Sequence, residues 1–168
     1  IVCLGDSVTG VYYHTGGRRA YPEMLELALR KTHPHKPPKV INAGISGHAT
    51  PNGLERLDRD VLNHKPQIVT ISFGLNDMVR VPPDAFRANL EELVRRCRVA
   101  GAQVVLCTPN AVLDTAGRPI EKLVGYCDTI RAVARANNLV VCDQFAAGQA
   151  MSLAEALATI LASDGQKG

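Results

Sequence analysis

Three short polar segments of this chain hold the residue types that acyl transfer requires. They are Gly5-Asp6-Ser7, Asn42-Ala43-Gly44 with Ser46-Gly47, and Gly74-Leu75-Asn76-Asp77. Acyl transfer needs a nucleophile, a base, and hydrogen-bond donors aimed at the oxyanion that develops. Ser7 supplies a hydroxyl, Gly44 a backbone amide with no side chain in the way, and Asn76 a neutral carboxamide. The segments therefore predict a nucleophile and an oxyanion hole, each donor stabilising the transition state by about 3 kcal/mol.

Each segment taken alone also has a structural explanation. A serine after a strand is often a helix N-cap, and Gly44 and Gly47 are ordinary loop residues. Asn76-Asp77 could simply cap the following turn. Asp6 and Asp77 could instead form a metal or phospho-acceptor pair, although no lysine follows the fourth or fifth expected strand to complete such a site. The combination of three segments in this order favours the acyl-transfer site.

Alternating strand and helix patterns indicate how the three segments are positioned. Short apolar runs predict strands at residues 1–4, 40–43, 68–73, 104–107 and 139–142. Apolar stripes at helical spacing predict helices at about residues 21–32, 53–63, 83–100, 120–136 and 152–162. This alternation predicts an α/β fold, a three-layer α/β/α sandwich with a flavodoxin-like five-stranded parallel sheet. In such folds ligands bind at the carboxyl ends of the strands, where the three segments lie.

The same motifs give the chain a family resemblance. Gly5-Asp6-Ser7, Asn42-Ala43-Gly44 and Gly74-Leu75-Asn76-Asp77 resemble the first three sequence blocks of the SGNH hydrolases, also called GDSL-type esterases or lipases. The resemblance implies that Ser7 is the nucleophile. It also implies an oxyanion hole made of the Ser7 and Gly44 amides and the Asn76 side chain. Members hydrolyse carboxylic esters or thioesters, including acetyl groups on sugars, without a metal or organic cofactor.

The general base is the missing part of this pattern. The family carries an Asp-x-x-His block near its C-terminus, and Asp164-Gly165 resembles the start of that block. Lys167 stands where the histidine is expected, and the chain ends one residue later. We therefore expect residues 1–168 to form a single SGNH-hydrolase-like domain without its extreme C-terminal segment, with Asp164 in the triad. The alternatives are a degenerate relative without activity, or a base from elsewhere, such as His14, His48 or Lys167.

Composition excludes several other classes of function. The net charge is +3 and aromatic residues make up 4% of the chain, so the basic and aromatic surface of a nucleic-acid reader is not expected. No apolar run approaches the length of about 18 residues that spans a membrane. No phosphate-binding glycine motif is present. Tyr12 and Tyr13 could form a wall for the substrate or pack in the core, and Arg18 and Arg19 could line the crevice or face solvent.

The five cysteines bear on compartment rather than on chemistry. No two have metal-ligand spacing, and all fall in apolar runs or stripes, so we expect buried thiols rather than disulfides. This pattern favours a reducing, cytoplasmic compartment. The chain starts on an apolar strand without Met, which leaves export after removal of a leader open.

Together these features predict a serine esterase that cleaves a short-chain acyl ester, such as an acetyl ester, of a small molecule or carbohydrate through an acyl-serine intermediate. The alternative is a non-catalytic SGNH-like binding module that keeps the crevice but lacks the histidine base. The expected partner is the ester substrate, with no nucleic acid and no integral membrane segment. The acyl group, the alcohol and the oligomeric state do not follow from the sequence.

Overall fold

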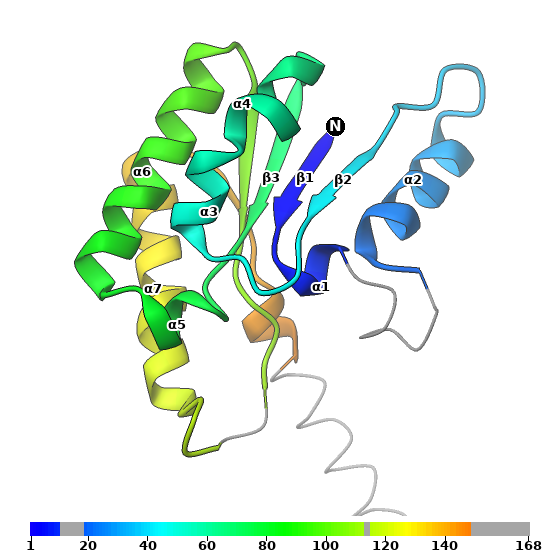
Figure 1. Ribbon diagram of the computed structural model, residues 1–168. Helices are drawn as coiled ribbons and strands as arrows, with labels where there is room; N and C mark the ends of the chain where they lie inside the picture. The colour runs from blue at the N-terminus through cyan, green and yellow to red at the C-terminus, as the bar shows by residue number, and fades with distance from the viewer. Residues whose placement is uncertain (11–18, 113–114, 149–168) are drawn as a thin grey trace, which may run out of the picture.

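Five parallel strands form the centre of the molecule in a computed structural model that describes residues 1–10, 19–112 and 115–148 (Figure 1). They are β1 (Val2–Gly5), β2 (Ile41–Gly44), β3 (Ile68–Ser72), β4 (Gln103–Cys107) and β5 (Val140–Cys142). Their order in the sheet is β2-β1-β3-β4-β5, and every pairing is parallel. All five predicted strands are confirmed, each within one residue of its expected bounds.

Three long helices also follow the predicted pattern. They are α2 (Tyr21–Thr32), α6 (Pro83–Val99) and α7 (Ile120–Ala136), and each has a proline just before it or within its first two positions. Proline suits this place because the first amides of a helix have no partner within the helix. Two further helices have only four residues: α1 (Ser7–Gly10), which begins two residues after β1 ends, and α5 (Asp77–Arg80), which begins five residues after β3 ends.

The single helix expected at residues 53–63 is wrong. The chain instead forms α3 (Thr50–Glu55), α4 (Leu57–Asp60) and a 3-10 turn, η1 (Leu62–His64). The path breaks at Arg56 and Val61, where φ and ψ are −100° and 3°, and −125° and −65°. The apolar spacing survives these breaks, which is why a continuous helix was predicted. The helix expected at 152–162 lies outside the described residues.

The described helices lie on both faces of the sheet, which confirms the layered α/β architecture. Figure 1 shows α3, α4, α6 and α7 on one side of the strands and α2 on the other. Strand β2 lies on one side of β1 while β3, β4 and β5 continue on the other. Right-handed crossovers in these two opposite directions place their helices on opposite faces. The reversal occurs between β1 and its two neighbours, which is where ligands bind in folds of this type.

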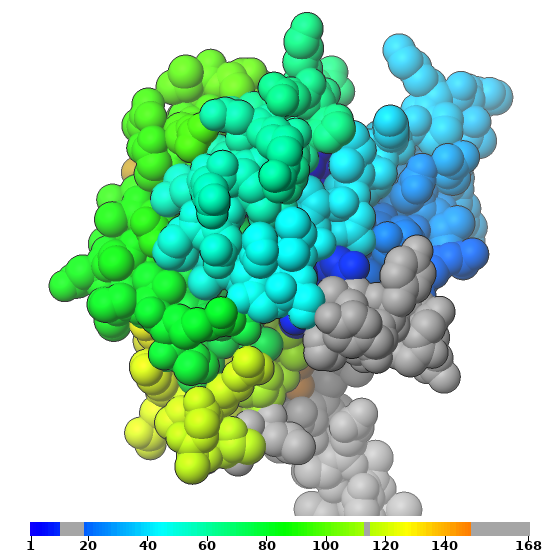
Figure 2. All heavy atoms as spheres, viewed as in Figure 1, coloured from blue at the N-terminus to red at the C-terminus, as the bar shows by residue number. Residues whose placement is uncertain are grey.

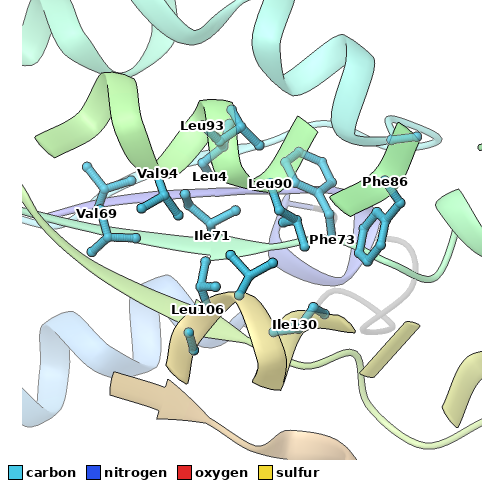
Figure 3. Close-up of a cluster of buried hydrophobic side chains, with 14 of the residues drawn as sticks. Leu4, Val69, Ile71, Phe73, Phe86, Leu90, Leu93, Val94, Leu106 and Ile130 are labelled. Atoms are coloured by element: carbon cyan, nitrogen blue, oxygen red, sulfur yellow. The ribbon is translucent and has the colours of Figure 1, made fainter. Parts of the chain in front are cut away.

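The hydrophobic core fixes the strands against α6 and α7. Figure 3 shows Leu4, Ile71 and Leu106 from three neighbouring strands, close to Leu90 of α6 and Ile130 of α7. Each of these side chains is at most 1% exposed. Burial of a side chain of this size contributes about 1.5 to 3 kcal/mol. The strand ends that carry the polar segments are therefore mounted on a rigid support.

The cysteines are free thiols, as expected, but one of them is not buried. Cys3, Cys97, Cys107 and Cys127 are buried, whereas Cys142 is exposed. Cys142 belongs to β5, which pairs only with β4 at the edge of the sheet. Burial raises the pKa of the Cys107 thiol to about 12. Thiols of this kind are inert packing groups at neutral pH.

Candidate active site

The strand register brings the three polar segments together at the carboxyl ends of the strands. Gly5 at the end of β1 pairs with Gly44 at the end of β2 and with Ser72 at the end of β3. The Ile45 amide donates to the Gly5 carbonyl at 3.1 Å, so the β2 loop stays beside the β1 end after the strands stop. In the space-filling view of Figure 2, only small patches of the blue N-terminal segment are visible at the surface, and they lie beside the cyan segment around residue 50.

Ser7 lies at the first position of α1, immediately after β1, and is half-buried. Its neighbour Asp6 is 3% exposed, and the Asp6 carboxylate accepts the Val8 amide at 2.9 Å. The pKa of Asp6 is raised to about 6, mainly by burial and to a lesser extent by nearby Asp77, which together outweigh the lowering by the Val8 hydrogen bond and by Arg118. Asp6 thus fixes the turn that carries Ser7, while its charge is poorly solvated.

Asn76 is 6% exposed and its carboxamide is held from two sides. Its Nδ2 donates to the His48 carbonyl at 2.9 Å, and its Oδ1 accepts from Arg118 Nη2 at 3.5 Å. A carboxamide has two N–H donors. One N–H of Asn76 therefore has no partner among the described residues and is available to a ligand.

Asp77 is a structural anchor rather than a free acid. One oxygen accepts the Thr50 amide at 2.8 Å and the Thr50 hydroxyl at 2.6 Å, and the other accepts the Gly74 amide at 3.0 Å. The side chain is fully buried, and this burial raises the pKa of Asp77 despite its hydrogen bonds. The described residues contain no cluster of three or more His, Cys, Asp or Glu side chains that could hold a metal ion.

Gly44 lies where β2 passes closely against α1. Its amide donates to Asn42 Oδ1 at 3.0 Å, so that donor is already occupied. A Cβ at Gly44 would lie 2.4 Å from the Gly10 nitrogen, which leaves no room for a side chain where β2 passes α1. The glycine at position 44 therefore permits close packing between these two elements.

Gly47, three residues further on, presents an amide that no described residue accepts. It lies in a turn closed by the His48 amide, which donates to the Ile45 carbonyl at 3.2 Å. Its φ of +76° lies in the left-handed region that favours glycine. Its carbonyl accepts Arg80 Nη2 at 2.7 Å, and Asn76 holds the next carbonyl. We refer to residues 45–48 as the β2 turn.

Arg56 is a buried cation that the sequence analysis missed. It is 4% exposed and donates to the Gly5 carbonyl at 2.9 Å and to the Ala43 carbonyl at 2.7 Å. It also donates to Asp60 Oδ2 at 3.2 Å and to His48 Nδ1 at 3.2 Å. Arg56 therefore ties the ends of β1 and β2 to the β2 turn. Nothing in the spacing distinguishes it from a solvent-facing arginine, so no sequence signal was available.

His48 is poorly suited to be the general base. Because Arg56 donates to its Nδ1, the neutral ring carries its proton on Nε2, and neither nitrogen keeps a free lone pair. Desolvation and the charge of Arg56 lower the pKa of His48, which favours this neutral form. His33 and His35 are exposed beyond α2, and His64 lines a hollow with Ile1 at the opposite end of the strands.

Of the other residues that the sequence suggests for the site, one is exposed to solvent and the rest lie outside the described residues. Arg19 is exposed. A narrow hollow beside α1 is lined by four apolar side chains and by three polar ones, those of Asp6, Ser72 and Asn110. The other predicted residues, namely Tyr12, Tyr13, His14, Arg18, Asp164 and Lys167, lie outside the described residues.

The GDSL-like lipase/acylhydrolase family matches residues 3–165, which is nearly the whole sequence. The chain belongs to this family. The resemblance drawn from the three polar segments is thereby confirmed, and with it the assignment to the esterases and acylhydrolases at the level of family. No helix among the described residues has the length and apolar character needed to cross a membrane.

Curated relatives of this GDSL-family chain include named esterases. It is 35% identical to an arylesterase of Vibrio mimicus over 107 residues, which are 63% of this chain and 52% of the relative. It is 27% identical to an acetylxylan esterase of Geobacillus stearothermophilus over 131 residues, 71% of this chain and 60% of the relative. The chain spans about half the length of the curated relatives it matches.

Solved structures agree with the family assignment. A lipase/acylhydrolase from Enterococcus faecalis superposes with a TM-score of 0.72 at 31% identity, covering 87% of this chain and 76% of that chain. LAE5, an α/β hydrolase from the metagenome of Lake Arreo, gives a TM-score of 0.76 at 25% identity, covering 90% and 79%. The α/β fold is therefore that of the family.

Proposed function

We propose that this chain is a serine esterase that hydrolyses a short-chain acyl ester of a small molecule or carbohydrate through an acyl-Ser7 intermediate. The observation that carries the proposal is the meeting of Ser7, Asn76 and the β2 turn at one sheet edge, with an unpaired N–H on Asn76. Family membership supports hydrolase chemistry. The names of two relatives, an arylesterase and an acetylxylan esterase, support an ester as substrate.

In the proposed reaction, Ser7 Oγ attacks the ester carbonyl carbon and a C–O bond forms. The carbonyl oxygen becomes an oxyanion, the alcohol leaves with a proton, and water then hydrolyses the acyl-Ser7 ester. A general base must take the Ser7 proton, and none of the histidines among the described residues is placed to do so. Asp164, His14 and Lys167 remain candidates for the acid and base roles.

Three donors would stabilise the oxyanion. Two are the Ser7 amide, which is the first of α1, and the free N–H of Asn76. The sequence favours the Gly44 amide as the third, but that amide already donates to Asn42. The Gly47 amide is the better candidate, because it has no described partner and its turn is hydrogen-bonded directly to Asn76. Each fixed donor is expected to contribute about 3 kcal/mol.

The acyl group that we propose is acetyl or a similarly short group. The support for it is the name of one relative, an acetylxylan esterase. The hollow beside α1, lined by Asp6, Val8, Ser72, Phe73, Leu75, Pro109 and Asn110, is too small to hold a water molecule and so does not set the size of the acyl group.

The test is hydrolysis of p-nitrophenyl acetate by the wild-type chain and by Ser7→Ala. Ser7→Ala should lower kcat by at least about 1000-fold, because no covalent intermediate can form. Its melting temperature should hardly change, because the Ser7 hydroxyl is only half-buried. Thr32→Ala, an exposed hydroxyl at the end of α2, is the matched control and should keep full activity. Equal rates in wild type and Ser7→Ala would contradict the proposal.

A non-catalytic binding module is the second candidate. Two observations favour it: Nδ1 of His48 already accepts from Arg56, and Lys167 stands where the family has histidine. Under this alternative, wild type and Ser7→Ala would bind an acetylated xylo-oligosaccharide with equal affinity in calorimetry, and neither would release acetate. Release of acetate by the wild type alone would exclude this alternative.

A further inference from the structure

The Asn76 carboxamide can be oriented in two ways, and only one of them presents a donor to an oxyanion. In the observed orientation Nδ2 faces the His48 carbonyl and Oδ1 faces the Arg118 guanidinium. A flipped amide would place its oxygen against the His48 carbonyl and its N–H groups against a cation. Both contacts would be repulsive, since guanidinium has no acceptor and a carbonyl has no donor. Arg118 and His48 together therefore select the orientation that leaves one N–H free.

The turn at residues 115–118 positions Arg118 for its contact with Asn76. The Arg118 amide donates to the Thr115 carbonyl at 3.0 Å, and the Thr115 amide donates back to the Arg118 carbonyl at 3.4 Å. The turn directly precedes Pro119, the N-cap of α7, so its position is fixed by a long packed helix. The Arg118 side chain is half-buried.

The pairing of Arg118 also differs from that of the other inward-facing arginines. Arg56 is paired with Asp60 and Arg131 with Asp143, both at N···O distances of 3.2 Å or less. Arg118 has no acidic partner within 4.0 Å among the described residues, and its side-chain contact is with a neutral amide. A cation beside a carboxamide oxygen draws electron density from the nitrogen and strengthens its N–H groups as donors.

The charges around Arg118 are consistent with this role. The two nearby acids are Asp6 on the β1 end and Asp77 on α5, and both are buried. Burial raises the pKa of both acids, and the charge of Arg118 lowers that of Asp6. Arg118 thus adds a positive charge near a carboxyl group, that of Asp6, which is poorly solvated.

We infer that Arg118 is a positioning residue for the esterase reaction, which holds the Asn76 carboxamide in its productive orientation and strengthens its free N–H toward the oxyanion. The inference rests on the proposed function, because an oxyanion forms only if Ser7 attacks an ester. Under this inference Arg118 stabilises the transition state and does not contribute to binding of the substrate. Loss of Arg118 should therefore lower kcat and leave KM nearly unchanged, for neutral and anionic esters alike.

The kinetic experiment uses the full chain with Arg118→Met, Arg118→Lys and a matched control. Arg118→Met should lower kcat for p-nitrophenyl acetate by about tenfold, less than the hundredfold or greater loss expected when a donor is removed outright. Arg118→Lys keeps the charge and should recover part of the loss. Arg87→Met, which removes an exposed arginine paired with Glu91 on α6, should keep full activity. The anionic ester p-nitrophenyl succinate should show the same pattern.

A second measurement reports on the contact without any turnover. The side-chain amide resonances of Asn76, identified by their absence in Asn76→Asp, should shift in Arg118→Met and stay in place in Arg87→Met. Unchanged Asn76 resonances, or a loss seen only in KM for the anionic ester, would overturn the inference. Absence of Ser7-dependent turnover in the wild type would instead overturn the proposed function on which it rests.

Discussion

The two ends of the sheet differ in what they bury. The amino ends border a hollow of about 420 Å³, with walls that include Ile1, Pro38, Lys65 and Pro66. The carboxyl ends offer only a narrow space. The buried polar residues lie almost entirely at the carboxyl ends. Apart from Thr70, each of them either lies at or after the carboxyl end of a strand or, in the case of Arg56, donates hydrogen bonds to carbonyl groups there.

This difference shows that volume is a poor guide to chemistry in this molecule. Burying a polar group without partners costs free energy, so a set of buried polar groups persists only where hydrogen bonds hold it. At the carboxyl ends Arg56, Asn76 and Asp77 are each held by two or more hydrogen bonds. The amino-end hollow has no such network, and its lysines are exposed.

The largest contrast in activity is expected from removing one side chain at each end. Asn76→Ala deletes the proposed oxyanion donor and should lower kcat for p-nitrophenyl acetate by about 100- to 1000-fold. Gln67→Ala, in the wall of the amino-end hollow, should leave kcat unchanged. Steady-state kinetics on the two variants provides the check. A comparable loss in Gln67→Ala would mean that the amino end is the functional one.

The next contrast compares two arginines that share one acid. Arg56 and Arg59 both pair with Asp60, but the Arg56 side chain is 3% exposed and that of Arg59 is 74% exposed. Arg56→Met leaves the Gly5 and Ala43 carbonyls without their buried donor and should lower the free energy of unfolding by about 3 kcal/mol. Arg59→Met should leave it nearly unchanged, because an exposed ion pair is screened by solvent.

Urea unfolding of both arginine variants measures this contrast. In a folded fraction of Arg56→Met, the pKa of His48 should also rise, because a nearby cation and an N–H donor to Nδ1 are lost. Titration of the His48 ring by NMR reports this rise. Equal destabilisation by the two variants would show that Arg56 does not tie the strand ends together.

Asp6 gives a contrast that depends on pH. Its pKa is about 6 in the folded protein and 3.8 ordinarily, so the folded state binds more protons between these values. Stability contributed by protonated Asp6 is therefore present below about pH 4 and lost as pH rises through about 6. Asp6→Asn should be more stable than wild type at pH 7.5, by at most about 3 kcal/mol.

The advantage of Asp6→Asn should shrink toward zero below about pH 4, and urea unfolding at pH 7.5 and at about pH 3.5 measures it. Asp84→Asn, which removes an exposed acid in the first turn of α6, is the matched control for the loss of one negative charge. A stability difference between Asp6→Asn and wild type that stays constant across this range would contradict the assignment of a raised pKa to Asp6.

The smallest effect separates stability from activity. Gly47 and Gly101 have φ values of +76° and +85°, and a Cβ at either would meet nothing within 4 Å. Alanine at either position should lower the free energy of unfolding by about 1 kcal/mol through backbone strain alone. Only Gly47→Ala should also lower kcat, because Gly101 precedes β4 at the amino end of the sheet. Equal kcat in both variants would remove Gly47 from the oxyanion hole.

The sequence was informative wherever a short-range pattern carries the information. Apolar runs and stripes located all five strands and the three long helices, and Gly5-Asp6-Ser7 and Asn76 were located as strand-end residues. The break at Arg56 was not predictable, because the apolar spacing of Leu54, Leu57 and Val61 continues through it. Helical periodicity records which face is buried and not whether the backbone is continuous.

The contacts that hold the site were beyond the sequence for another reason. Arg56 and Arg118 lie 51 and 42 residues from the groups they contact, Gly5 and Asn76. No local sequence pattern distinguishes an arginine that faces solvent from one whose side chain points into the protein. Gly44 and Gly47 look alike in the sequence as loop glycines. They differ only in the folded chain, where Gly44 donates to Asn42 and packs against Gly10, while Gly47 adopts a positive φ.

The central claim is that Ser7 is the nucleophile, and covalent labelling tests it most directly. The intact protein is incubated with a fluorophosphonate probe, digested, and examined by mass spectrometry. We predict one adduct per chain, located on Ser7, with no adduct in Ser7→Ala. An unlabelled wild-type protein that is folded by circular dichroism, or an adduct at any other residue, would contradict the account.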